Sequence, residues 1–209
     1  MVTVDTITSS FVTLLVVIDP AGLAPMFLAL THRMAAPARR RIAVRACVIA
    51  ALVLIGSVLG GNWLLLQLGI SLPAFRIAGG LLLFSIASEM ILGVRTERQS
   101  KTAEQAREEH KHDVAAFPLA VPLMAGPGAI TATVLLAGHA GRDPASLAVL
   151  VAVIIANMLV CLCAYLIATR IERLFGTSGI DVLSRLLGLL LAALAVQFIV
   201  DGIRAVLAG

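Results

Sequence analysis

The fold of this chain is decided by Asp19-Pro20-Ala21-Gly22, which interrupts an apolar run over about residues 7–30. That run is long enough to cross a bilayer as a helix, which needs roughly 20 apolar residues. Proline removes a backbone donor and clashes with the preceding turn, so we expect the helix to break near Ile18. Because lipid cannot satisfy the freed N–H and C=O groups, the break predicts an interior site that is packed in protein or lines a wet cavity.

A counterpart lies in the second half of the chain, where Ala125-Gly126-Pro127-Gly128-Ala129 interrupts an apolar run over about residues 114–138. The ends of the halves also align at a constant offset: Arg76, Gly79 and Gly93 match Arg185, Gly188 and Gly202. Two matching breaks and an aligned span predict an internal duplication.

Composition predicts the class of protein. The 209 residues are 60% hydrophobic and 13% charged, with a mean hydropathy of +1.02, which indicates an integral membrane protein. The net charge of +4 comes from basic residues at the ends of apolar runs without interleaved aromatics, so we expect no nucleic-acid partner. The lipid bilayer is the expected partner.

Six apolar stretches predict an all-α polytopic fold, over about residues 7–30, 42–66, 77–93, 114–138, 147–169 and 186–207. We assign residues 1–93 to repeat one, 94–113 to a charged cytoplasmic linker containing His110 and His112, and 114–209 to repeat two. The linker histidines are expected to be solvated and not to bind a metal.

Three spans per repeat is an odd number, so the two repeats would be inverted if every stretch crosses the membrane. Most Lys and Arg lie in the first, third and fifth loops, which predicts that both termini face outward from the cell (inner) membrane. The alternative is that each broken stretch is a re-entrant hairpin that returns to its starting side. That alternative would move Arg170 and Arg173 outside, against the charge rule.

Asp19 has two compatible interpretations. It is well placed to cap a helix that restarts at Pro20, where the missing N–H costs nothing. A carboxylate at the centre of the membrane costs about 2.5–3.5 kcal/mol, however, so it could also bind a substrate ammonium, a cation or a transported proton.

The restarted helices predict a site for a small ligand with a carboxylate, because their N-terminal N–H groups and dipole ends favour an anion. Small residues leave this backbone accessible. The predicted substrate-binding residues are Asp19, Pro20, Ala21, Gly22, Gly126, Pro127, Gly128, Ala129, Thr131 and Asn157. Thr131 could instead bond its own preceding turn, and Asn157 could make an interhelical hydrogen bond.

Arg76 and Arg185 occupy matching positions three residues before a glycine, which points to a structural or gating role. We expect them to snorkel or to bond to the terminal carbonyls of the broken helices. Direct contact with substrate is the alternative.

Enzyme chemistry has no sequence support. Paired intramembrane carboxylates, H-E-x-x-H, G-x-S-x-G and a phosphate loop are all missing from the sequence. We therefore expect neither catalysis nor a cofactor nor a metal site.

Five segments together resemble the MarC, or small neutral amino acid transporter, family of six-span bacterial membrane proteins. They are Ile18-Asp19-Pro20-Ala21-Gly22 with Pro25-Met26-Phe27, Leu68-Gly69-Ile70, Ala74-Phe75-Arg76-Ile77-Ala78-Gly79-Gly80, Pro122-Leu123-Met124-Ala125-Gly126-Pro127-Gly128-Ala129 and Gly188-Leu189-Leu190-Leu191-Ala192. The resemblance implies an inner-membrane secondary transporter of glycine or alanine, coupled to a proton or sodium gradient.

Two other functions remain open at this point: export of another small metabolite or drug, and a non-catalytic accessory role in the membrane. The sequence does not decide the coupling ion, the direction of transport or the oligomeric state, including whether the chain forms a homo-oligomer.

Overall fold

The computed structural model describes residues 4–32, 34–95, 114–140 and 143–208. Every regular element among these residues is helical, as predicted. The elements are α1 (Val4–Ile18), α2 (Pro20–Thr31), α3 (Ala36–Gln67), α4 (Leu72–Leu92), η1 (Ala115–Met124), α6 (Pro127–Ala140), α7 (Pro144–Leu166) and α8 (Ala168–Ala208). The His110 and His112 prediction falls outside the described residues.

Among the residues that the structure describes, five helical stretches are long and apolar enough to cross a membrane, and the bent pair of η1 and α6 makes a sixth if it is one span. The number agrees with the six stretches that the sequence predicts. Some observed spans begin earlier in the chain than the predicted apolar stretches, because the prediction excluded charged and polar residues that the helices include. The third span begins at Leu72, where Ser71 caps the helix and Pro73 lies in its first turn, and the sixth begins at Ser178.

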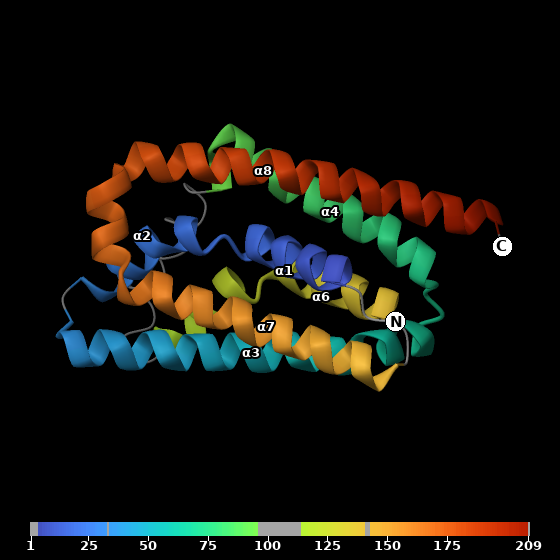
Figure 1. Cartoon of the computed structure of the whole chain (residues 1–209), viewed down its shortest axis with the longest axis horizontal. Coiled ribbons are helices and arrows are strands. Elements are labelled where there is room, and N and C mark those ends of the chain that lie inside the picture. The colour runs from blue at the N-terminus through green and yellow to red at the C-terminus, as the bar shows by residue number, and fades with distance from the viewer. Residues whose placement is uncertain (1–3, 33, 96–113, 141–142, 209) are drawn as a thin grey trace.

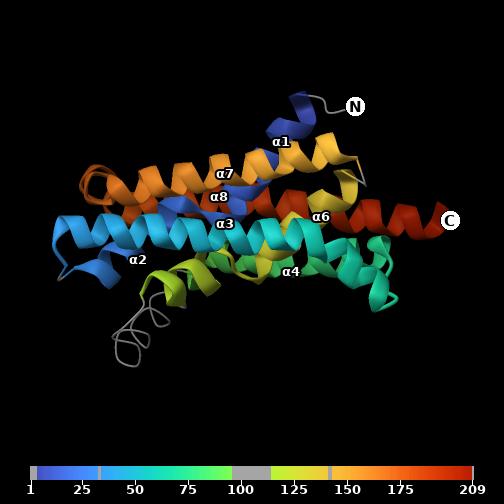
Figure 2. The same cartoon turned by 90° about the horizontal axis from the view of Figure 1, so that it is seen from below.

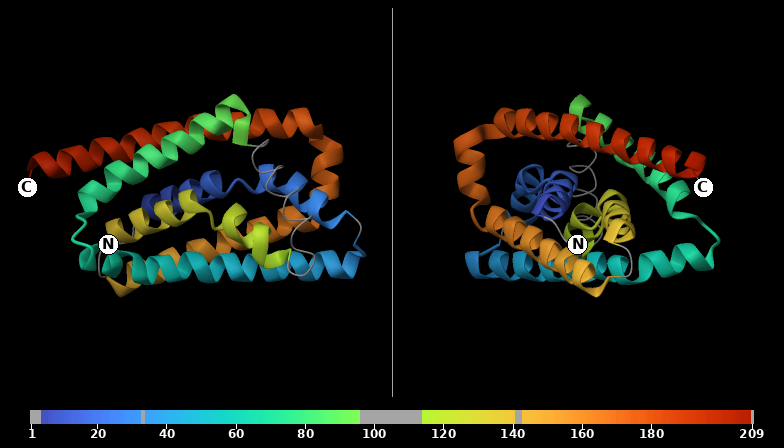
Figure 3. Two further views of the ribbon diagram at one scale, coloured as in Figure 1. Left: turned by 180° about the vertical axis from the view of Figure 1, so that it is seen from behind. Right: turned by 45° about the vertical axis from the view of Figure 1, so that its right-hand side comes forward.

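The helices form three layers (Figures 1 and 3). α4 packs along α8 on one side, and α3 packs along α7 on the other. Between these pairs lie the two broken stretches, α1 with α2 and η1 with α6. The first broken stretch is 67% buried over its most apolar window, against 28–33% for α3, α4, α7 and the span in α8. The breaks therefore lie in the interior, as the cost of unpaired backbone in lipid requires.

Each broken stretch continues through the bundle and does not double back. α1 and α2 run from the right-hand end of Figure 1 to the left-hand end, and η1 and α6 run the opposite way, which Figure 2 shows from below. η1 and α6 are bent by 57° at their break. Neither broken stretch reverses its direction within the described residues, and whether each of them crosses a membrane stays a prediction.

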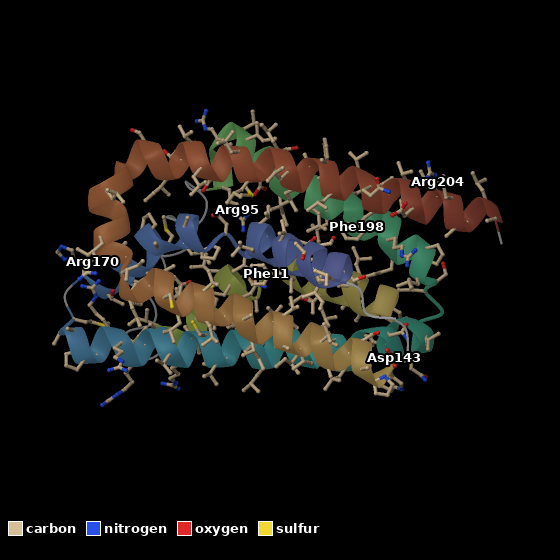
Figure 4. All side chains as sticks on the ribbon, viewed as in Figure 1. Phe11, Arg95, Asp143, Arg170, Phe198 and Arg204 are labelled. Carbon is tan, nitrogen blue, oxygen red and sulfur yellow. The ribbon has the colours of Figure 1, made fainter. Side chains whose placement is uncertain are left out.

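α1 begins and α8 ends toward the same end of the bundle (Figure 1). Arg170, after α7, lies at the opposite end, whereas Asp143, before α7, lies toward the same end of the bundle as the start of α1 (Figure 4). Asp143 caps α7, and hydrogen bonds from the hydroxyl and backbone N–H of Ser146 hold the pKa of its carboxyl below the ordinary value.

Candidate functional site

Asp19 separates α1 from α2 in the way the sequence predicts. α1 ends at Ile18, and Asp19 adopts a left-handed backbone conformation with φ 54° and ψ 66°. Its Oδ1 accepts a hydrogen bond of 3.0 Å from the N–H of Gly22, and Pro20 occupies the first helical position. Asp is one of the few residues besides Gly that tolerates this conformation, because its short side chain bonds locally. The cap is therefore confirmed.

The second carboxylate oxygen of Asp19 joins the break to a distant helix. Oδ2 accepts a hydrogen bond of 3.0 Å from the Ser184 hydroxyl on α8. Both residues are buried, with 5% and 6% of their surfaces exposed. Sequence reasoning missed Ser184, because no local pattern marks one hydroxyl in an apolar helix as the partner of a residue 165 positions away.

The packing of the Asp19 carboxylate requires glycine at position 22. A Cβ at Gly22 would overlap Asp19 Oδ2 and would lie 3.1 Å from the Ser184 hydroxyl. Gly22 thus permits the carboxylate to receive both of its bonds. Pro20 is buried and Ala21 is half-buried beside it.

The second break is built differently. η1 is not a regular helix, because Phe117 and Val121, which each precede a proline, have extended backbone conformations. α6 begins at Pro127, and the N–H of Ile130 donates to the Gly126 carbonyl at 3.0 Å. A Cβ at Gly126 would overlap the Pro122 carbonyl, so glycine is needed at this close backbone approach.

A cavity of about 280 Å³ lies at the second break. Its lining combines the break itself with the ends of α1 and α4. The residues are Val17, Ile86, Arg95, Pro122, Leu123, Met124, Gly126, Pro127, Gly128 and Ala129. All four residues predicted from the second break lie here. Asp19, Pro20, Ala21 and Gly22 do not line the cavity, although Val17 comes just before them.

Arg95 supplies the positive charge of this cavity. Its Nη2 donates a hydrogen bond of 2.9 Å to the Val17 carbonyl, in the last turn of α1, and its Nη1 lies 2.9 Å from Met90 Sδ. Figure 4 shows Arg95 beside the break between α1 and α2. The expectation that Arg95 belongs to a solvated linker is therefore wrong. A cation at this position complements the negative end of the α1 dipole.

Among the described residues no hydrogen bond joins Arg76 or Arg185 to the broken helices, so the structure does not show the expected bond to their carbonyls, and snorkelling stays a prediction. The Arg185 guanidinium lies over Gly93, the C-cap of α4, with Nη2 3.2 Å from the place a Cβ would take. Arg76 lies beside Gly202 on α8 through its Cβ, 3.2 Å from the place a Cβ of Gly202 would take, and its buried Nε has no hydrogen-bond partner within the described part of the chain. These two pairs are equivalent by sequence, because the alignment of the two halves matches Arg76 with Arg185 and Gly93 with Gly202. The duplication itself stays a prediction.

Thr131 and Asn157 lie outside the cavity lining. Thr131 is buried against Gly79, where a Cβ would lie 2.6 Å from its methyl group. Asn157 Nδ2 donates to the Val153 carbonyl at 3.0 Å and approaches the Phe11 carbonyl on α1 at 3.5 Å. The position of Asn157 matches the interhelical interpretation. Thr131 packs between helices, and no bond from its hydroxyl to its own preceding turn is found among the described residues.

An aromatic contact near the first break has no counterpart in the sequence analysis. The rings of Phe27 on α2 and Tyr165 on α7 stack with their centroids 4.7 Å apart. The Arg39 guanidinium lies 5.9 Å above Phe27. The Tyr165 hydroxyl is buried and makes no hydrogen bond to any described residue. This stack packs α2 against α7.

Among the described residues, no group of three or more His, Cys, Asp or Glu lies close enough together to hold a metal ion. The polar features that the structure describes are therefore the break at Asp19, the cavity that contains Arg95, and the hydrogen bonds that join different helices.

The chain is similar to known membrane proteins over nearly its whole length. The model of the MarC family of integral membrane proteins matches residues 4–207. A membrane protein of Archaeoglobus fulgidus, UPF0056, is 39% identical over 93% of this chain and 91% of its own length. UPF0056 membrane protein YhcE of Escherichia coli is 35% identical over 95% and 92%, respectively.

A third relative, UPF0056 membrane protein MJ1677 of Methanocaldococcus jannaschii, is 36% identical over 95% of this chain and 96% of its own. No solved structure matches the chain. A family match over nearly the whole length, together with relatives of the same length, leads to one conclusion: this chain belongs to the MarC family of integral membrane proteins.

Proposed function

We propose that this protein is a secondary transporter of small neutral amino acids, glycine and alanine, and that it binds them in the cavity at the second break. The observation that carries the proposal is the lining of that cavity by the start of α6 and by Arg95. Its substrate would have a compact apolar body and one carboxylate.

The volume favours a small substrate. Pockets for drug-sized ligands range over about 300–1,000 Å³, and this cavity of about 280 Å³ lies just below that range. Its walls include Pro127, Gly128 and Ala129, which add little side-chain bulk. Glycine and alanine fit such a space better than a drug does.

The charges favour a carboxylate. The first N–H groups of α6 have no intrahelical acceptor, and the positive end of its dipole lies at the same place. Arg95 adds a guanidinium, which matches a carboxylate in geometry and bonds to it by two parallel N–H donors. Binding would take one donor of Arg95 from the Val17 carbonyl.

The ammonium of the substrate would lie toward the end of α1. Pro20 has no N–H to offer to the Val16 carbonyl, and the Val17 carbonyl is held by a side chain and not by the next turn. These carbonyls form the negative end of the α1 dipole. Asp19, the next polar group along the chain, adds a buried carboxylate to the same end.

Transport accounts for the two interior breaks better than catalysis or an accessory role does. Discontinuous helices at membrane depth place dipole ends around a substrate, and an accessory subunit has no need of them. The protein would act in the inner membrane with both termini outside, driven by a proton or sodium gradient and without a cofactor. The 94–113 linker would face the cytoplasm.

An uptake panel in proteoliposomes tests this proposal. Purified protein is reconstituted and offered radiolabelled glycine, alanine, leucine, glutamate and a cationic drug, with empty liposomes as the control. We expect counterflow of glycine and alanine only. Transport of the drug without glycine or alanine would favour the exporter, and no transport of any compound would favour the accessory role.

A further inference from the structure

The cavity at the second break has an apolar wall on α4, formed by Ile86. This residue is half-buried and lines the cavity opposite the chain of α6. A Cβ at Gly128 would overlap Cδ1 of Ile86, so this methyl group lies directly over the first turn of α6. That turn carries the N–H groups to which the proposed function assigns the substrate carboxylate. The α-carbon of a bound amino acid, one bond from its carboxylate, would therefore lie beside Ile86.

The space beside Gly128 is limited mainly by this one methyl group. After Cδ1 of Ile86, the atoms nearest to a Cβ at Gly128 are Cγ1 of Val17 at 3.6 Å and Cδ2 of Leu83 at 3.7 Å. Both distances are ordinary van der Waals contacts. Removing Cδ1 would therefore open room at this point, whereas Val17 and Leu83 leave enough space for a carbon already.

The backbone of α4 cannot withdraw to enlarge the cavity, because α4 packs closely along α8 on its other side (Figure 1). A Cβ at Gly80 of α4 would lie 2.8 Å from the Ala195 carbonyl oxygen of α8. A Cβ at Gly188 of α8 would lie 3.1 Å from the Ala87 carbonyl oxygen of α4. These two close approaches hold the segment of α4 that carries Ile86.

The side chain of Ile86 is stiff as well. A β-branched residue in a helix has one strongly preferred χ1 rotamer, so Cδ1 moves only by rotation about χ2. An unbranched methionine would adapt to a larger substrate through its three rotatable bonds. Isoleucine on a fixed helix instead sets the depth of the cavity at this point.

We propose that Ile86 is the specificity-determining residue of the site, and that its δ-methyl group limits the substrate side chain to the hydrogen of glycine or the methyl group of alanine. This inference rests on the proposed function, because it assigns a wall to the site proposed there. An apolar pocket discriminates by about 10- to 200-fold for one methylene group. One methyl group in the wall is thus enough to separate alanine from α-aminobutyrate, which has one carbon more.

Ile86→Val tests the proposal most cleanly, because it removes Cδ1 and keeps every other carbon of the side chain. Purified variants are reconstituted in proteoliposomes, and counterflow of radiolabelled α-aminobutyrate is measured relative to that of alanine. We expect this ratio to rise about tenfold or more in Ile86→Val. Ile86→Ala, which removes two further carbons, should also transport valine. Ratios equal to that of the wild type in both variants would overturn the inference, while alanine counterflow by the wild type would leave the proposed function standing.

Ile91→Val is the matched control, because it makes the same change at another half-buried isoleucine of α4. Ile91 faces α8, where its Cγ1 lies 3.2 Å from the place a Cβ of Gly188 would take, and it does not line the cavity. Its ratio should equal that of the wild type. An equal rise in Ile91→Val and Ile86→Val would overturn the inference, because general loosening of α4 would then explain both. A wild type without glycine and alanine counterflow would overturn the proposed function and this inference with it.

Thermal unfolding of Gly128→Ala in two backgrounds tests the contact without any transport. The new Cβ overlaps Cδ1 of Ile86 in the otherwise wild-type protein and meets no such atom in Ile86→Val. Gly128→Ala should therefore lower the unfolding temperature less in the Ile86→Val background than in the wild-type background. Equal shifts in the two backgrounds would overturn the inference, whatever compound the protein transports.

Discussion

Substitutions at Asp19 separate the three things that this residue does in the structure. Its Oδ1 caps α2 through Gly22, its Oδ2 bonds to Ser184, and its backbone has a positive φ. Asn, Gly and Ala each keep a different subset of these features. We predict that the three variants will lose stability in the order Asn, Gly, Ala.

Asp19→Asn should change the free energy of unfolding by less than about 1 kcal/mol. Asn caps a helix as well as Asp does and also tolerates the left-handed conformation. Its amide N–H can donate to the Ser184 hydroxyl, which can rotate to accept. The weaker neutral hydrogen bonds are offset by removal of a buried charge that costs about 2.5–3.5 kcal/mol at the membrane centre.

Asp19→Gly should be about 1–2 kcal/mol less stable than Asp19→Asn, because both variants lose the buried charge but only glycine loses the bond from Ser184 and leaves that buried hydroxyl unpaired. Asp19→Ala should lose about 1–2 kcal/mol more than Asp19→Gly, since alanine pays the steric cost of the left-handed conformation that glycine avoids. The difference between these two variants isolates the backbone term.

Thermal unfolding of the purified variants in one detergent measures this order, and proteoliposome counterflow of glycine measures function in parallel. Asp19→Asn should retain counterflow. Equal stabilities for Asp19→Ala and Asp19→Asn would refute the reasoning, because neither the cap nor the positive φ would then matter. Loss of proton-gradient stimulation in Asp19→Asn alone would show that the charge of Asp19 takes part in coupling.

Three further predictions concern packing and topology. Gly22→Ala should unfold at a lower temperature than the wild type, because its Cβ overlaps the Asp19 carboxylate. Its control is Gly56→Ala on α3, where nothing lies within 4 Å of the new Cβ, and this variant should gain about 0.5–1 kcal/mol in the free energy of unfolding. A stabilised Gly22→Ala would contradict this packing. Tyr165→Phe should unfold at the same or a higher temperature, because its buried hydroxyl lacks a hydrogen bond among the described residues, and a loss above about 1 kcal/mol would show a partner that this geometry does not contain. A cysteine introduced at Ala208 should be labelled by a membrane-impermeant maleimide from outside intact cells, and labelling only after lysis would place the C-terminus in the cytoplasm.

Local backbone chemistry was sufficient to predict the breaks. Pro20 and Pro127 cannot continue a helix that precedes them, and Asp19 has the side chain of an N-cap, so both interruptions and the cap follow from neighbouring residues. The number of spans follows equally from apolar length. These inferences need no knowledge of how the helices pack.

Contacts between distant residues were not predictable in the same way. The bond from Arg95 to the Val17 carbonyl joins residues 78 positions apart, and the bond from Ser184 to Asp19 joins residues 165 apart. The density of charged residues after position 94 predicted that Arg95 belongs to a solvated linker. The sequence does not show that α4 ends beside the break between α1 and α2. The cavity therefore contains the second break but gains its charge from a residue assigned elsewhere.

The binding of glycine to wild-type protein and to Arg95→Gln tests the central claim most directly. Isothermal titration in detergent should show that the wild type binds glycine and that glycinamide, which lacks the carboxylate, binds far more weakly. A hydrogen bond to a charged group contributes about 1.5–3 kcal/mol, so Arg95→Gln should weaken glycine binding roughly 10- to 150-fold and leave the weak binding of glycinamide unchanged. Equal glycine affinity in the two proteins, or equal affinity of the wild type for glycine and glycinamide, would contradict a carboxylate site at Arg95 and α6.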